Sequence, residues 1–173
     1  MKTKSNKTLS QKHRISASPF QAICDSLAVL VATICETKYA IISVKDMHYF
    51  LFVSTVGVVG LEKVEVKNAI CIHGEMNELI EIQDASLDER FVKNPLVVGK
   101  PNIRFYAAVP IALPLGEQIG TVCVFDSEPR RLNSTQAQAL LHIAKVVLDT
   151  MVAEDFVYKQ INNLQLPEMT YEN

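Results

Sequence analysis

The stretch from Arg104 to Leu113 constrains the fold more than any other part of the chain, because its two faces differ in bulk. Successive side chains of a strand point to opposite faces. One face would carry the large side chains Phe105, Val109, Ile111 and Leu113. The other would carry Tyr106, Ala108 and Ala112. We expect the bulky face to pack against helices and the face with the two alanines to leave space.

Further strands are predicted on both sides of this stretch. Residues 39–44 and 49–55 are rich in β-branched and aromatic side chains and are joined by a short polar turn, which is typical of a hairpin. Residues 79–83 form a third candidate strand, and 118–125 form the last, after the turn at Gly116. In 118–125 we expect the smaller face, with Gly120, Val122 and Val124, to lie beside the alanines.

Two long helices are predicted at the ends of the folded region. Apolar residues recur at heptad spacing over 18–35, where Ser18, Pro19 and Gln21 provide a helix start. Asn133 and Gln136 form a second capping box, and the helix that follows extends from 134 to 161. Such a helix is ~42 Å long. Because this exceeds what a small domain needs to cover its sheet, we expect the overhang to contact a partner.

The order of elements predicts an α+β fold. Hairpins joined in this way give an antiparallel sheet with the two long helices on one face. A short helix near 67–71 and the long irregular segment 84–103 would cover the other face. We divide the chain into a flexible basic arm (1–17), one domain (18–161) and a tail (162–173).

Charge and cysteine content exclude several classes of protein. Of 17 basic residues, five lie within residues 1–18, which contain no acidic residue, and the net charge of the chain is -2. Nucleic-acid binding and a membrane span are not indicated, and the basic arm is either a solvated tail or an electrostatic tether. The four cysteines form no C-x-x-C pair, so we expect free thiols, no metal, no cofactor and a cytoplasmic location.

Several ordered motifs resemble the GAF domain family of bacterial signalling proteins. The resemblance covers roughly residues 18–155 and rests on the segments Asp84-Ala85-Ser86-Leu87-Asp88-Glu89-Arg90-Phe91, Asn94-Pro95-Leu96-Val97, Ile103 to Pro110, Gly120 to Asp126, Pro129 to Leu132 with Gln136, and Cys71-Ile72-His73. It implies a GAF-like sheet with a ligand position on the face away from the long helices. Relatives of this branch usually precede a kinase or nucleotide-cyclase output domain.

Known ligands of that family are not implied for this chain. The Asn-Lys…Phe…Asp-Glu signature of members that bind cyclic nucleotides is missing, and Cys71 and Cys123 lack the context of bilin attachment. No cysteine lies between these two, whereas members that reduce free methionine sulfoxide use cysteines there. Ala108 stands where many relatives have Gly, which narrows the pocket.

The candidate site is a cavity between the sheet and its covering segments. We expect it to be lined by Tyr106, Phe91, Ala108, Cys71 and His73. In the alternative, Phe91, Leu96 and Val97 fill the space and form a second small core. We also expect Arg104 to be buried and bonded to a carboxylate of segment 84–89, and we interpret Asn94-Pro95 as a turn.

These observations favour a non-catalytic regulatory domain. We expect a homodimeric sensor, with a small-molecule ligand, that acts through a separate output protein. One alternative is a small cysteine-dependent redox enzyme on the same fold, using Cys71 beside His73. The other is a domain with a filled pocket that serves only as a dimer scaffold.

Overall fold

A computed structural model describes residues 19–163 of the chain, and side-chain burial for 19–156. The predicted arm at 1–17, the cap Ser18 and residues 164–173 of the predicted tail lie outside the described residues.

A six-stranded antiparallel sheet forms the centre of the domain, with the strand order β3-β2-β1-β6-β5-β4. The strands are β1 (Tyr39–Lys45), β2 (Tyr49–Val56), β3 (Lys63–Glu65), β4 (Ile80–Ile82), β5 (Phe105–Ala112) and β6 (Gln118–Asp126). The predicted strands are present, although β4 is shorter than expected. The short edge strand β3 was not expected. Its three residues alternate charged and apolar side chains, but three residues are too few to give a strand pattern in the sequence.

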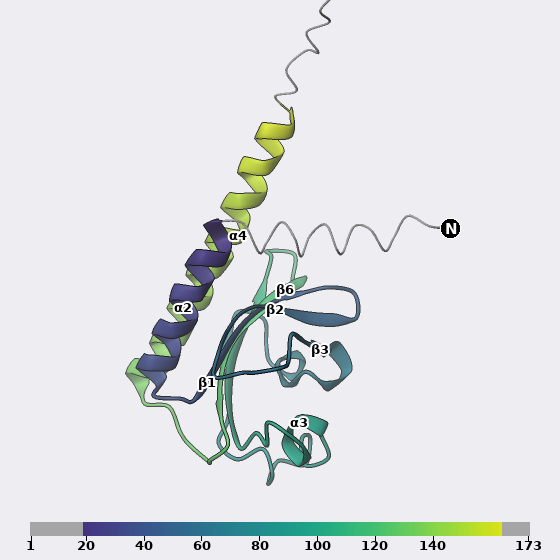
Figure 1. Ribbon diagram of the computed structural model, residues 1–173, viewed down its shortest axis with the longest axis vertical. Coiled ribbons are helices and arrows are strands. Elements are labelled where there is room, and N and C mark those ends of the chain that lie inside the picture. The colour runs from purple at the N-terminus through teal and green to yellow at the C-terminus, as the bar shows by residue number, and fades with distance from the viewer. Residues whose placement is uncertain (1–18, 164–173) are drawn as a thin grey trace, which may run out of the picture.

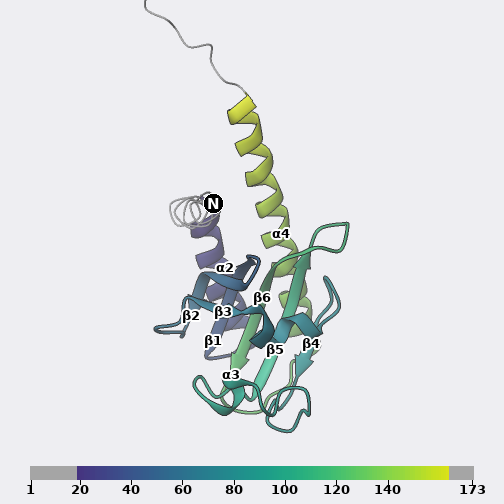
Figure 2. The same ribbon diagram turned by 90° about the vertical axis from the view of Figure 1, so that its right-hand side faces the viewer.

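Two long helices, α2 (Pro19–Cys35) and α4 (Ser134–Asn163), lie side by side on one face of the sheet (Figures 1 and 2). Their buried faces and one face of the sheet enclose the first core. Its fully buried members include Cys24, Ala28, Val31, Phe105, Val122, Val124, Leu140 and Val147. The predicted α+β architecture is thereby confirmed.

The other face of the sheet is covered by short elements and connecting segments. These elements are the two 3-10 turns η1 (Val66–Asn68) and η2 (Ile70–His73) and the one-turn helix α3 (Pro95–Val98). Figure 1 shows this covering layer on the side of the sheet away from α2 and α4. A second core lies beneath it, with Phe50, Ile70, Phe91, Val97, Tyr106 and Ala108 among its buried members.

The faces of β5 agree with the expectation, and those of β6 do not. Phe105, Val109 and Ile111 belong to the first core, and Tyr106 and Ala108 belong to the second.

Ala108 is paired with Cys123 across the two strands. Directly opposed residues share a face, so the larger face of β6, with Thr121, Cys123 and Phe125, lies beside the alanines. The prediction that placed Val122 and Val124 there was wrong, because bulk alone does not determine register.

The start of α4 follows the predicted chemistry. The Asn133 side-chain oxygen accepts a hydrogen bond from the backbone N–H of Gln136 at 2.9 Å. The Gln136 side-chain oxygen accepts one from the backbone N–H of Asn133 at 3.0 Å. The capping box is therefore formed as predicted. Asn94 does more than mark a turn, because its side chain caps α3 through Leu96 N and donates to the Asn68 carbonyl at 3.0 Å.

Candidate functional site

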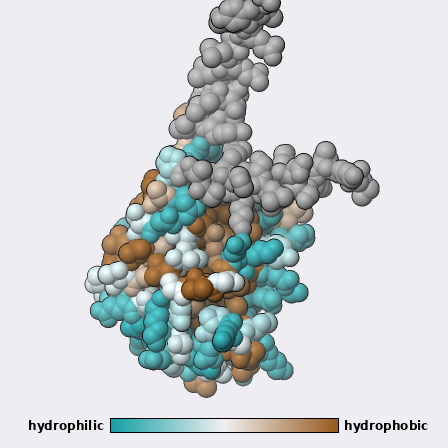
Figure 3. Space-filling model, in the orientation of Figure 1, coloured by the Kyte–Doolittle hydropathy of each residue, from teal (hydrophilic) through white to brown (hydrophobic). Residues whose placement is uncertain are grey.

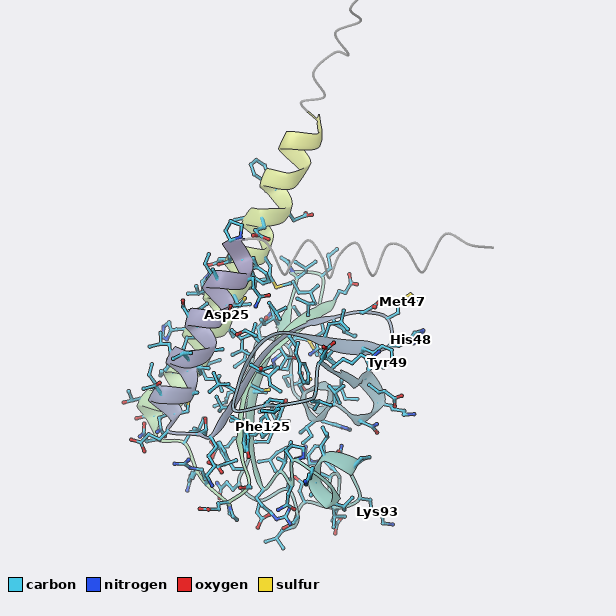
Figure 4. All side chains as sticks on the ribbon, viewed as in Figure 1. Asp25, Met47, His48, Tyr49, Lys93 and Phe125 are labelled. Carbon is cyan, nitrogen blue, oxygen red and sulfur yellow. The ribbon has the colours of Figure 1, made fainter. Side chains whose placement is uncertain are left out.

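A cavity of about 50 Å³ lies between the sheet and its covering layer. Five strands line the floor of the cavity through the residues Ile41, Ser43, Phe50, Phe52, Val64, Tyr106, Thr121, Cys123 and Phe125. The connecting and covering segments supply Leu61, Ala69, Ile70, Cys71, Leu96, Pro101 and Ile103. Figure 4 shows side chains from both layers filling most of the intervening space, with the labelled Phe125 on the sheet. The site is thus a small gap in an otherwise packed second core.

The few polar groups of the wall are hydrogen-bonded to one another or to the backbone. Gln118 Nε2 donates to Thr121 Oγ1 at 3.0 Å, and Thr121 Oγ1 donates to the Gly120 carbonyl at 2.7 Å. The Ser43 hydroxyl donates to the Thr121 carbonyl at 3.4 Å. In the part of the chain whose side chains are described, no buried side-chain nitrogen or oxygen lacks a partner.

Two thiols and a phenol meet in the wall of the cavity. The Tyr106 hydroxyl is hydrogen-bonded to the Cys71 and Cys123 thiols. Burial, together with a smaller contribution from the neighbouring Cys71, raises the pKa of Cys123 to about 12. Burial likewise raises the pKa of Cys71, against the opposing effect of hydrogen bonds from Thr121, Gln118 and Tyr106. All three groups are therefore neutral near pH 7.

The structure brings some of the five predicted site residues together. Cys71 and Tyr106 line the cavity. Phe91, Ala108 and His73 are not among its lining residues. Ala108 is fully buried in β5, and Phe91 is buried beside the cavity, with the Arg90 guanidinium 4.8 Å from its ring centroid.

The arrangement does not pair Cys71 with His73 as a reactive dyad. Both lie in η2, where Cys71 is buried and His73 is exposed. The His73 ring meets the edge of Phe91 instead, with 5.1 Å between ring centroids. A catalytic thiol needs a base or a positive charge that stabilises the thiolate, and the raised pKa of Cys71 indicates the opposite environment.

Most residues of the cavity wall were not predicted from the sequence. Strand alternation could have identified some of them. Thr121 and Phe125 follow from alternation once Cys123 is placed opposite Ala108. Ser43 follows similarly, because it is paired with Thr121 across β1 and β6. Leu61, Leu96 and Pro101 line the cavity because of the paths that irregular segments take across the sheet. Hydrophobic periodicity does not predict such paths.

The prediction for Arg104 was wrong. Its guanidinium donates to the carbonyls of Val97 at 3.1 Å and Ile103 at 3.0 Å, and the residue is only partly buried. Asp84 and Asp88 bond to neighbouring residues instead. Asp84 accepts from Ser86, and Asp88 forms a 2.7 Å ion pair with Arg90. Carboxylates in a turn bond most readily to the amides and side chains two residues further on.

The face of the sheet away from α2 and α4 contains both a second core and a small cavity, so each of the two expected arrangements is present in part. Phe91 and Val97 are buried and Leu96 packs against them, so a second core exists. The cavity remains beside these residues. At about 50 Å³ it is a third of the volume of an engineered ~150 Å³ cavity that binds benzene.

Neither a metal centre nor a membrane span is visible in the part of the chain that is described. Within residues 19–163, no group of three or more His, Cys, Asp or Glu residues is placed to hold a metal ion. None of the helices described there combines the length and apolar character needed to cross a bilayer.

A second candidate surface lies on the two long helices. Several large apolar side chains there are at least one third exposed, namely Ile23, Val29, Leu30, Val146, Val152 and Phe156. Phe156 in α4 is 62% exposed, and α4 extends beyond α2 (Figure 1). On the face shown in Figure 3, hydrophobic side chains also gather near the middle of the domain, among hydrophilic ones.

Comparison with known proteins gives a family and a related sequence. The family model described as GAF domain matches residues 19–148. A cyclic di-GMP phosphodiesterase from Pseudomonas aeruginosa is 35% identical over 115 residues, which make up 65% of this chain and 19% of that protein. The chain thus spans about a fifth of the length of the relative that it matches.

Solved structures share the fold at low sequence identity. The GAF domain of a phosphoenolpyruvate-protein phosphotransferase from Acinetobacter superposes with a TM-score of 0.67 at 17% identity, covering 91% of this chain and 98% of that one. A free methionine-R-sulfoxide reductase from Neisseria meningitidis gives 0.65 at 12% identity, covering 83% and 84%. At these identities the similarity concerns the fold, which regulatory domains and enzymes both use.

Proposed function

Because this chain belongs to the GAF domain family, we propose that it is a non-catalytic regulatory domain. In this proposal a small molecule binds in the cavity, the chain forms a homodimer through α2 and α4, and a separate output protein receives the signal. A bacterial cytoplasmic setting is part of the same proposal. The fold and the family are the established part, and they are the premise for the rest.

The alternation of side chains along β6 is the observation that carries this proposal. Thr121 and Cys123 line the cavity, whereas Val122 and Val124 belong to the core beneath the two helices. A molecule that displaces the cavity wall therefore acts on a strand whose opposite side supports α2 and α4. Close packing allows such a displacement to be transmitted, because cores have little free volume to absorb it.

The exposed apolar residues on the helices support the dimeric part of the proposal. Leu30 on α2 and Val152 on α4 are 47% and 50% exposed. Helices that leave such side chains uncovered commonly bury them against another helix. The 30 residues of α4 correspond to ~45 Å, which provides length beyond the sheet for that contact.

The alternative is a cysteine-dependent redox enzyme, and a methionine sulfoxide reductase is among the structural neighbours. The environment of the thiols disfavours it. All four cysteines are buried, and the two in the cavity have raised pKa values. A buried neutral thiol is a poor nucleophile.

Native mass spectrometry of the full chain tests the proposal. We expect a dimer at tens of micromolar, with a fraction carrying the additional mass of a small molecule retained through purification. A parallel assay adds free methionine sulfoxide and dithiothreitol. A monomer without bound mass would contradict the proposal, and catalytic turnover of the sulfoxide would establish the enzyme instead.

A further inference from the structure

The chemical composition of the cavity wall limits what can bind there. Of the 16 residues that line the cavity, 11 have purely hydrocarbon side chains. The other five are Ser43, Cys71, Tyr106, Thr121 and Cys123. Among the residues that the structure describes, none with a charged side chain or a carboxamide lines it. A charged group that left water for this wall would find no counter-ion, which is strongly unfavourable.

The polar atoms of the wall are already engaged in hydrogen bonds. The hydroxyl hydrogens of Ser43 and Thr121 are directed to backbone carbonyls. The Tyr106 hydroxyl is bonded to the two thiols. A ligand rich in hydrogen-bonding groups would have to break these contacts, whereas a ligand with one polar group can share a hydroxyl lone pair.

The size of the cavity limits the ligand further. At about 50 Å³ the cavity is smaller than an engineered 150 Å³ cavity that binds benzene. Leu61, in the segment between β2 and β3, is the most exposed residue of the wall, at 38%. The cavity therefore lies closest to solvent at Leu61.

We propose that the cavity selects an uncharged, largely apolar molecule of a few carbon atoms with at most one polar group, and that it excludes anions, including nucleotides. This inference rests on the proposed function, because it presupposes that the cavity binds a ligand. It also predicts that cyclic di-GMP, which the name of the relative mentions, does not bind in this cavity, because its phosphate charges would find no partner in the wall.

A titration with two matched probes tests the selectivity. The full chain is labelled with ¹³C at isoleucine, leucine and valine methyl groups and titrated with 1-butanol or with butyrate, which share a carbon chain and differ in charge. The methyls of Ile41, Ile70 and Ile103 report on the cavity. Those of Val31 and Leu140, in the first core, serve as internal controls.

A cavity-filling variant gives the experiment its specificity. Ala69 lines the cavity and has an extended backbone, with φ −76° and ψ 125°, which a β-branched side chain adopts readily. Ala69→Val should fill the gap, weaken the butanol response at least about tenfold by steric exclusion, and leave the control methyls unchanged. Ala153→Val makes the same chemical change at an exposed position of α4 and should retain the response.

The outcomes separate the two proposals. Saturable shifts of the cavity methyls with butanol alone, lost in Ala69→Val, support an apolar selective cavity. Saturable shifts with butyrate, alone or together with butanol, would overturn the selectivity while leaving a ligand-binding domain. Absence of a cavity response to every probe, or equal shifts of the control methyls, would overturn this inference and the ligand-binding part of the proposed function.

Discussion

Among single residues, Asp126 has the widest set of connections, because its buried carboxylate joins the ends of three elements. It terminates β6, accepts from Arg130 at 3.0 Å ahead of α4, and lies 3.5 Å from the Lys38 ammonium between α2 and β1. Arg130 also donates to the Glu36 carbonyl. The end of β6 is therefore fixed to the segment that follows α2 and to the segment that precedes α4.

Asp126 should make stability depend on pH in acid. Burial acts to raise its pKa, but the hydrogen bonds from Arg130, Ser127 and Lys38 outweigh burial and hold the pKa below its usual value. A carboxyl whose pKa is depressed by folding stabilises the protein above the unfolded value of ~3.9, and this contribution is lost as the pH falls through the folded pKa. Stability should therefore decline as the pH falls below the unfolded value.

The variant Asp126→Asn tests this assignment by urea unfolding at pH 7 and pH 3. It should lower the free energy of unfolding by about 1–3 kcal/mol at pH 7 and flatten the acid dependence. Glu128→Gln is the matched control, because Glu128 is an exposed carboxylate that also contacts Lys38, and it should change stability little. Equal effects of the two variants would contradict a special role for Asp126.

The four thiols should react slowly in the folded protein. Burial raises the pKa of Cys24 to about 12 and that of Cys35 to about 11, and the two cavity thiols are similarly protected. Reaction with a chromogenic disulfide at pH 8 should release four equivalents only after denaturant is added. Rapid labelling of Cys71 or Cys123 without denaturant would revive the redox interpretation.

At the scale of elements, the features that depend on neighbouring residues could be predicted from the sequence, and those that depend on distant contacts could not. Helix α4 and its capping box depend on residues three positions apart, and the hairpin of β1 and β2 depends on one turn, so the sequence predicted both. The register of β6 against β5, the edge strand β3 and the partners of Arg104 depend on contacts between distant segments. The candidate site is formed mainly by such contacts, so only Cys71 and Tyr106 of the five predicted residues lie on the cavity.

The capping box of α4 should contribute measurably to stability. Gln136 also donates to the Ile34 carbonyl at 3.1 Å, so the start of α4 is bonded to the last turn of α2. Asn133→Ala should lower the free energy of unfolding by about 1 kcal/mol, as at other helix N-caps. Asn133→Asp, which retains the acceptor, should restore most of it. An unchanged midpoint of thermal unfolding in Asn133→Ala would show that the cap is dispensable.

For the whole molecule, the two faces of the sheet have different tasks in our proposal. The covering layer surrounds the cavity, and the helices opposite carry the exposed apolar residues. The expected assembly is a parallel homodimer in which α2 and α4 of both chains form a bundle. The family assignment supports the fold of the protomer, and the pairing of protomers is the prediction that follows from the helix surfaces.

The double variant Leu30→Glu, Val152→Glu should give a monomer. Both side chains are about half exposed, so charges there disrupt an interface without entering the core. Leu148 is less suitable, because it packs against the first core. Light scattering should give half the wild-type mass. Val59→Glu, at a residue 95% exposed between β2 and β3, is the control and should remain dimeric. A monomeric wild type at tens of micromolar would contradict the assembly.

The division of the cavity between floor and cover has an evolutionary consequence. The floor residues Thr121 and Cys123 cannot change freely, because they share a strand with the residues that support the helices. The covering residues, such as Leu61, Ala69 and Pro101, belong to segments that contribute only to the second core or to the cavity. In the proposed function, mutations in the cover therefore alter which molecule is recognised and leave the contact between β6 and the helices unchanged.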